Sequence, residues 1–184
     1  MNKIDRLKTA YSKHIHIPWR NDASPEERVI FCVYSENDEL VLRSRVEEFA
    51  IETRDAGHKW LHFDLTNSFS TWLTSQKYGE QYFKRPELIM STISGYASDI
   101  EQSFRDFLAS DGADENTVVA ITGVGTLFGF LKVRDVVATF APLVSGRLVV
   151  FFPGNYENNN YRLLDAYDGW NYLAVPITSD TDIR

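Results

Sequence analysis

The sequence predicts a single-domain α/β fold, a three-layer sandwich with a mainly parallel, Rossmann-like central sheet. Apolar segments of strand length alternate along the 184 residues with amphipathic segments of helix length, which is the pattern of strands joined by helical crossovers. Two of these strands, Thr117–Thr122 and Arg147–Phe152, are separated by a helix-length connection and therefore form a parallel β-α-β unit. A composition of 43% hydrophobic and 14% aromatic residues suits one sizeable core.

The whole chain, residues 1–184, is expected to be one domain. Residues 1–25 should form an N-terminal helix and loop, and residues 26–184 the sheet core. The helix is predicted over residues 2–14, because three apolar residues recur there at helical spacing. They are Ile4, Leu7 and Tyr11.

Two strands with a helix between them follow. The first strand is predicted at Arg28–Tyr34, and the helix after it should run to about Asp55. Gly57 is expected to end this helix, because glycine readily adopts the left-handed conformation of a helix cap. The second strand is predicted at Lys59–Leu65. The next helix carries three large apolar residues on one face: Phe69, Trp72 and Leu73.

Residues 78–84 are predicted to be an irregular, aromatic-rich link between helices. Pro86 suits the first turn of a long helix that should run to about Leu108. After the β-α-β unit, a last short strand is predicted at Asn171–Ile177.

The right-handed crossover rule places the turns after the two strands of the β-α-β unit at the same carboxyl edge of the sheet. In open α/β sheets this edge is where ligands and partners usually bind. Four residues define the turns: Gly123, Gly125, Pro153 and Gly154. The dinucleotide fingerprint needs a glycine where Phe128 stands, and a phosphate-binding loop needs a Gly-Lys-Ser/Thr run that Lys132 does not supply. A tight turn with closely packed backbones is therefore the favoured interpretation, with nucleotide or phosphate sensing as the alternative.

The composition disfavours several function classes. A net charge of −7 opposes the approach of phosphates, so direct nucleic-acid binding is not expected. Cys32 is the single cysteine and lies in an apolar strand, where a buried, unreactive thiol is expected. No apolar segment is long enough to span a bilayer and the N-terminus lacks a signal-peptide core, so a cytoplasmic protein is predicted.

No catalytic set, metal site or cofactor is predicted. The four histidines lack cysteine or histidine partners at metal-ligand spacing: His14, His16, His58 and His62. Asp64 should lie at the carboxyl edge, but helix capping explains a single acid there as well as catalysis does. A hydrolase centred on Asp64 is kept as a further alternative to the expectation that the protein is not an enzyme.

The connection from residue 155 to residue 170 is rich in the aromatic, arginine and asparagine side chains that are common at recognition surfaces. Its partner-binding candidates are Tyr156, Asn158, Asn159, Tyr161, Arg162 and Asp168. An ordered loop, in which Arg162 pairs with Asp165 or Asp168 and Trp170 fills the core, explains the same composition.

Several segments together resemble the BrxB family of bacteriophage-exclusion (BREX) defence systems. They are Pro18-Trp19, Glu27-Arg28-Val29, Ala56-Gly57-His58-Lys59-Trp60, Asp64-Leu65-Thr66, Tyr82-Phe83, Gly123-Val124-Gly125-Thr126-Leu127-Phe128-Gly129, Gly146-Arg147-Leu148-Val149-Val150-Phe151-Phe152-Pro153-Gly154, Asn160-Tyr161-Arg162-Leu163-Leu164-Asp165 and Asp168-Gly169-Trp170-Asn171-Tyr172-Leu173. The last two blocks are long enough to be specific.

The resemblance implies a small, non-catalytic core or adaptor subunit of an antiphage defence complex, acting through protein–protein interaction. Its implied partners are a PglZ-type alkaline-phosphatase-like protein and a BrxC-type ATPase of the same system. It implies no catalytic residues.

Overall fold

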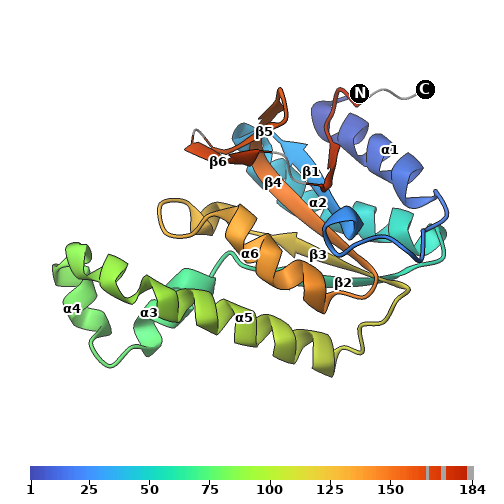
Figure 1. The fold of residues 1–184 in the computed structure, drawn as a ribbon. Coiled ribbons are helices and arrows are strands. Elements are labelled where there is room, and N and C mark those ends of the chain that lie inside the picture. Colours follow the sequence, from blue (N-terminus) through green and yellow to red (C-terminus); the bar gives the residue numbers. More distant parts are fainter. Residues whose placement is uncertain (165, 171–172, 182–184) are drawn as a thin grey trace.

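The computed structural model describes the chain except for residues 165, 171–172 and 182–184, and its described part contains a parallel sheet between layers of helices (Figure 1). The strands of this sheet lie in the order β2-β3-β4-β1-β7, and every neighbouring pair along it is parallel. Their bounds are β1 Val29–Tyr34, β2 Lys59–Asp64, β3 Thr117–Thr122, β4 Arg147–Glu157 and β7 Val175–Ile177. The predicted α/β class with a mainly parallel sheet is confirmed.

The helices cover both faces of the sheet (Figure 1). The α-helices are α1 Lys3–Ile15, α2 Glu39–Asp55, α3 Ser68–Ser75, α4 Gly79–Lys84, α5 Ile93–Ser110 and α6 Val133–Phe140. The short 3-10 turns are η1 Glu26–Arg28, η2 Glu36–Asp38, η3 Pro86–Thr92, η4 Val124–Leu127 and η5 Ala141–Leu143. Side chains of α1 and α2 form one buried cluster with the sheet, and those of α3, α5 and α6 form the other.

Strand β1 shows why an inner strand of the sheet is apolar throughout. Phe31 and Val33 point into the cluster with α5 and α6, whereas Ile30 and Cys32 point into the cluster with α1 and α2. A strand buried on both faces must be apolar at every position, which explains the unbroken run read from the sequence. The thiol of Cys32 is free and buried, as predicted, and burial raises its pKa.

The crossovers fix where a functional site can lie. The chain leaves β1 through α2 on one face, and it returns from β2 to β3 and β4 through α5 and α6 on the other. Because the chain moves in opposite directions along the sheet on the two faces, all three of these crossovers are right-handed. After β4 the chain again joins the α5 and α6 side. The adjacent strands β1 and β4 therefore send the chain to opposite faces, which makes their carboxyl ends a topological switch point.

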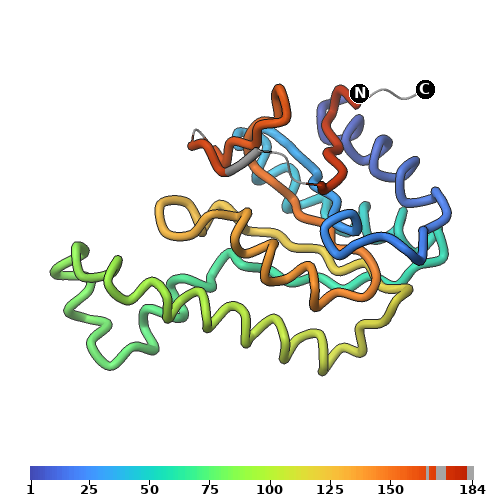
Figure 2. The backbone as a smooth tube through the Cα atoms, viewed as in Figure 1, coloured from blue at the N-terminus to red at the C-terminus, as the bar shows by residue number. Residues whose placement is uncertain are grey.

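Helix α1 belongs to the folded core. Its first turn has a capping box, in which the Asn2 side chain accepts from the Asp5 backbone and Asp5 accepts from the Asn2 backbone. The hydroxyls of Tyr11 and Thr53 lie 2.6 Å apart between α1 and α2. Figure 2 shows the start of α1 beside the last described segment, where Arg6 lies 3.8 Å from Asp180. The amphipathic spacing thus predicted this helix correctly.

Two predictions in the middle of the chain were wrong. Residues 78–84 are not an irregular link, because Gly79–Lys84 is helical and Tyr82 packs against the core. The long helix begins at Ile93, seven residues after Pro86, because Pro86–Thr92 forms 3-10 turns. The hydroxyl of Thr92 donates to the carbonyl of Ile89 there (3.0 Å), a local bond that competes with α-helical geometry.

The prediction of a connecting loop over residues 155–170 was also wrong, because most of these residues belong to strands. β4 continues past Phe152 to Glu157 and pairs in antiparallel fashion with β5 (Asn160–Leu163), which pairs with β6 (Ala166–Trp170). Gly154 allows this continuation, because a Cβ atom there would lie 1.9 Å from the carbonyl oxygen of Arg162. The last strand is shorter than predicted, Val175–Ile177, and residues 171–172 lie outside the described residues.

Candidate functional site at the carboxyl edge of the sheet

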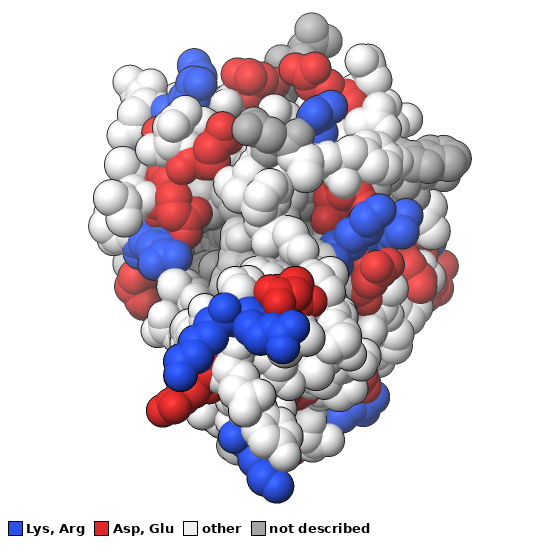
Figure 3. Space-filling model, turned by 90° about the vertical axis from the view of Figure 1, so that its left-hand side faces the viewer, with Lys and Arg blue, Asp and Glu red and all other residues white. Residues whose placement is uncertain are grey.

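The Gly123–Gly125 turn and Pro153-Gly154 lie next to each other at the carboxyl edge, as the crossover rule predicts, but Pro153-Gly154 is part of β4 and not the predicted turn. A Cβ atom on Gly125 would lie 3.8 Å from Cγ of Pro153. Figure 3 views the molecule from the left-hand side of Figure 1, where this edge lies, and shows uncharged surface between groups of acidic and basic side chains. Both segments therefore contribute to one surface.

Gly123 is required for close packing. Its φ is +75°, and a Cβ atom there would lie 2.4 Å from the backbone nitrogen of Thr66 and 2.8 Å from Oδ1 of Asp64. A side chain would collide with main-chain atoms that cannot move away easily. The geometry supports the interpretation of this turn as a point of close backbone contact.

Asp64 and its neighbours form a hydrogen-bonded cluster between β2 and β3. Oδ1 of Asp64 accepts from the Thr66 backbone nitrogen (2.9 Å) and hydroxyl (2.6 Å), and Nε2 of His62 lies 2.7 Å from the Thr122 hydroxyl. Partial burial by itself raises the pKa of Asp64, but hydrogen bonds from Thr66 and Thr122 outweigh it and hold that pKa below its usual value. Burial lowers the pKa of His62. These polar groups bond to one another across the strand ends.

A crevice of about 200 Å³ opens beside this cluster, at the switch point. Its walls come from residues near the ends of strands β1 to β5 and from the start of α2: Glu36, Glu39, Arg43, Thr66, Gly123, Gly125, Thr126, Pro153 and Leu164. Arg43 supplies the positive charge, and it already donates to Glu39 (2.8 Å) and to the hydroxyl of Thr66 (3.1 Å). With two carboxylates and one engaged arginine on its walls, the crevice attracts phosphate weakly.

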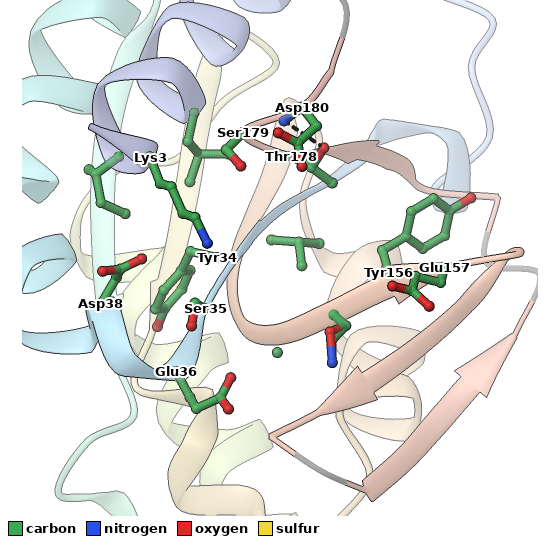
Figure 4. Close-up of a pocket in the computed structure, with 15 residues that line it drawn as sticks. Lys3, Tyr34, Ser35, Glu36, Asp38, Tyr156, Glu157, Thr178, Ser179 and Asp180 are labelled. Carbon is green, nitrogen blue, oxygen red and sulfur yellow. Dashed lines mark hydrogen bonds between the residues drawn. The ribbon is translucent and has the colours of Figure 1, made fainter. Parts of the chain in front are cut away.

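A larger cavity of about 590 Å³ lies on the other side of β1, between α1, the strand ends and the segment 178–180 (Figure 4). Its charged lining residues are Lys3, Glu36, Asp38, Glu157 and Asp180. Four carboxylates against one ammonium group make this cavity acidic. Both cavities at the switch point therefore disfavour an anionic ligand.

The predicted recognition residues Asn158 and Asn159 form the exposed two-residue turn between β4 and β5. Their φ values are 51° and 63°, both left-handed, as in the turns that suit tight hairpins. The hydroxyl of Tyr156 donates to Oδ1 of Asn159 (2.9 Å), and its ring lies 4.6 Å from that of Tyr161. The turn therefore projects from the sheet edge, with Tyr156 half-buried at its base.

Tyr161 and Arg162 follow the alternation of β5, so they differ in exposure. Tyr161 is buried and its ring contacts Phe31 and Phe152, whereas Arg162 is exposed. Burial removes Tyr161 from the surface that could meet a partner, which corrects its place among the partner-binding candidates.

Asp168 also belongs to the interior, with 3% of its surface exposed. Its two carboxylate oxygens accept from the backbone nitrogens of Val133 (2.8 Å) and Arg134 (2.9 Å), the first residues of α6. A carboxylate at a helix N-terminus satisfies amides that have no partner within the helix. Its place as a partner-binding candidate is corrected to that of a helix cap. The alternatives that involve Asp165 and the Trp170 side chain lie outside the described residues.

Sequence reasoning missed two exposed aromatic residues on this edge. Phe128 is 43% exposed and Tyr167 is 45% exposed. Together with other residues they line a cavity of about 240 Å³: Gly129, Phe130, Leu131, Lys132, Leu163, Ala166 and Asp168. For Phe128 the available signal was Gly129, because glycine often marks a turn, and its φ of +79° in the structure is left-handed.

The histidines serve local contacts. The ring of His58 stacks on Trp19 at 3.7 Å, and Nδ1 of His16 lies 2.7 Å from the carbonyl oxygen of Ser12. Within the described residues, no three histidine, cysteine or acidic side chains are grouped as metal ligands. The same part of the chain contains no helix with the length and apolar character needed to cross a bilayer.

Comparison with known families gives one result. The model of the BrxB family, described as BREX protein BrxB, matches residues 66–177, which is more than half of the chain. The matched segment contains β3, β4, the hairpin, the Gly123–Gly125 turn and Pro153-Gly154. Searches of curated proteins and of solved structures found no match.

Proposed function

The chain belongs to the BrxB family of BREX proteins, and on this premise we propose that it is a non-catalytic adaptor of a BREX antiphage defence system. It would bind a larger protein of the same system, either the PglZ-type alkaline-phosphatase-like protein or the BrxC-type ATPase. The proposed docking surface consists of Phe128, Tyr167 and the hairpin turn Asn158-Asn159.

The exposed aromatic pair is the observation that supports this surface most strongly. Phe128 and Tyr167 flank an open, largely apolar cavity. Partially exposed aromatic side chains beside a cavity are typical of the residues that dominate binding energy at protein interfaces. A hairpin that projects from the same edge adds contact area.

The polar groups of the edge favour binding over catalysis. Asp64 accepts hydrogen bonds from Thr66, and Asp168 accepts from the start of α6. A general acid or base needs a proton position that a substrate can reach. A carboxylate that is held by neighbouring amides and hydroxyls serves structure first, so the hydrolase alternative receives little support.

Nucleotide or phosphate sensing at Gly123–Gly125 is supported less well than docking. Gly123 packs against the Asp64–Thr66 turn, and Glu36 and Glu39 stand on the walls of the crevice. An anionic ligand would meet these carboxylates before it reached the turn. A thermal shift with ATP that requires Gly125 would reverse this ranking.

Co-purification tests the proposal. The tagged chain is co-expressed with the PglZ-type and BrxC-type proteins of its system, as wild type and as the Phe128→Ser/Tyr167→Ser double variant. We expect one partner to co-purify with wild type and to be lost with the double variant. Ile51→Ser is the matched control, because Ile51 is 49% exposed on α2, away from the proposed surface. Equal capture of the partner by wild type, the double variant and Ile51→Ser would exclude this surface.

A further inference from the structure

A second group of residues, around Arg147, lies at the amino edge of the sheet, opposite the carboxyl edge. It is separate from the glycine residues of the carboxyl edge and from the hairpin. Arg147 is the first residue of β4, and its guanidinium lies 4.7 Å from the ring centre of Trp19. Its nitrogens donate to two backbone carbonyls, of Gly146 (3.2 Å) and Arg20 (3.3 Å). A guanidinium has five N–H donors, so these two bonds leave donors available.

Arg147 and its neighbour Arg28 differ from most arginines of this acidic protein. Within the described residues, neither has a carboxylate within 4.0 Å. Eight other arginines do: Arg6, Arg20, Arg43, Arg45, Arg54, Arg85, Arg105 and Arg134. Arg28 donates to the carbonyl of Ser145 (2.8 Å), and its buried Nε has no hydrogen-bond partner.

Two cations without a counterion are held close together here. Burial and the charge of Arg28 lower the pKa of Arg147, and burial and the charge of Arg147 lower the pKa of His14. The Trp19 ring offsets part of this cost through a cation–π contact. An anion bound beside Arg147 would offset the remaining repulsion and supply acceptors for the free N–H groups of its guanidinium.

A cavity of about 150 Å³ is open beside the guanidinium. Arg147, His14 and Trp19 form its polar side, and its apolar wall comes from Ile17, Pro18, Ala23, Ile30 and Val175. Arg20 and Glu27 complete the lining. Both are engaged locally, since Arg20 pairs with Asp22 and Glu27 accepts from the backbone nitrogen of Ser24 (2.8 Å). Among the described residues that line the site, Arg147 is therefore a cation without a carboxylate partner, and it stands beside an apolar wall.

We infer that this cavity binds a carboxylate that is attached to an apolar group, with Arg147 as the residue that recognises the charge. A planar carboxylate matches the two-pronged geometry of a guanidinium. The carboxylate of Glu27 in the same wall disfavours a doubly charged phosphate. The apolar wall accommodates the body of the ligand. The cavity lies at the edge opposite the proposed docking surface, so it is independent of that proposal.

Titration of the wild-type protein tests the site directly. Sodium benzoate, benzamide and inorganic phosphate are added separately to ¹⁵N-labelled protein, and the indole N–H signal of Trp19, assigned with Trp19→Phe, is followed. We expect benzoate to shift this signal saturably. Benzamide, which has the same shape without the charge, and phosphate should shift it little.

Arg147→Gln should weaken benzoate binding about tenfold or more, which corresponds to the loss of a charge-assisted hydrogen bond. Arg105→Gln is the control, because Arg105 is an exposed arginine on α5 that pairs with Glu101. The inference fails if wild-type protein gives no saturable benzoate shift, or if benzamide or phosphate binds equally well. These outcomes are decided on wild-type protein and stand even if Arg147→Gln does not fold.

Discussion

Replacement of Asp168 by alanine gives the sharpest test of its assignment as the cap of α6. The carboxylate is nearly fully buried and bonds at 2.8 and 2.9 Å to the first two backbone nitrogens of α6. Alanine would leave both amides without their acceptor in the protein interior. The variant should therefore lose stability while its surface stays unchanged.

The size of the loss follows from these contacts. A hydrogen bond to a charged group contributes about 1.5–3 kcal/mol, and loss of a helix cap costs about 0.5–2 kcal/mol. Both bonds end on one carboxylate, so their contributions are not additive. We expect Asp168→Ala to lower the free energy of unfolding by about 2–4 kcal/mol.

Urea denaturation followed by circular dichroism measures this loss. Asp135→Ala is the matched control, because Asp135 is an acid in the first turn of the same helix with 67% of its side chain exposed. It should change stability by less than about 0.5 kcal/mol. If Asp168→Ala were as stable as Asp135→Ala but failed to capture a BREX partner, Asp168 would be a surface contact and the cap assignment would be wrong.

Three further predictions concern the turns and the histidines. Gly123→Ala should lower the free energy of unfolding by more than about 2 kcal/mol. Gly129→Ala should lower it by only about 1 kcal/mol, because no atom lies within 4 Å of the added Cβ. Equal losses in urea titrations would contradict the packing argument. Burial lowers the pKa of His14 and His62 in the folded protein. As pH falls through about 6.5, the unfolded chain therefore binds more protons than the folded chain. The contribution of the two neutral histidines to the free energy of unfolding is thus full above that pH and declines below it. The melting temperature should therefore fall from about pH 7.5 to about pH 5.5, less so in His14→Gln/His62→Gln, and an identical pH profile in that variant would refute the assignment. Asn158→Gly/Asn159→Gly should keep the melting temperature, whereas alanine at both positions should lower it, because φ of 51° and 63° strains alanine by about 1 kcal/mol per residue; equal melting temperatures would show that the turn is not left-handed.

Apolar runs and glycine positions correctly predicted the strands and helix ends that depend on residues close together in the sequence. The apolar runs of β1, β3 and β4 identified strands that are buried on both faces. Gly57, with a φ of +87°, follows the last residues of α2, as expected of a glycine that ends a helix. The crossover rule then placed Gly123–Gly125 and Pro153-Gly154 at one edge without any knowledge of strand order. These inferences needed only periodicity, glycine chemistry and handedness.

Long-range pairing set the limit of sequence reasoning. Pro153-Gly154 looked like the end of a strand, but pairing with β5 carries β4 on to Glu157. The cap of α6 comes from Asp168, which lies 35 positions from Val133, so no local motif announces it. Tyr161 and Arg162 are neighbours with opposite exposure, and the alternation that separates them exists only once β5 is recognised as a strand.

Hydrogen exchange on the complex with a BREX partner tests the central claim most directly. Backbone amides of the free and bound chain are compared by mass spectrometry after the PglZ-type or BrxC-type protein has been captured. The adaptor proposal predicts slowed exchange at residues 125–132 and in the hairpin at 154–164, with the amino edge around Trp19 unchanged. Slowed exchange confined to α1, α2 or the amino edge would contradict docking through the carboxyl edge.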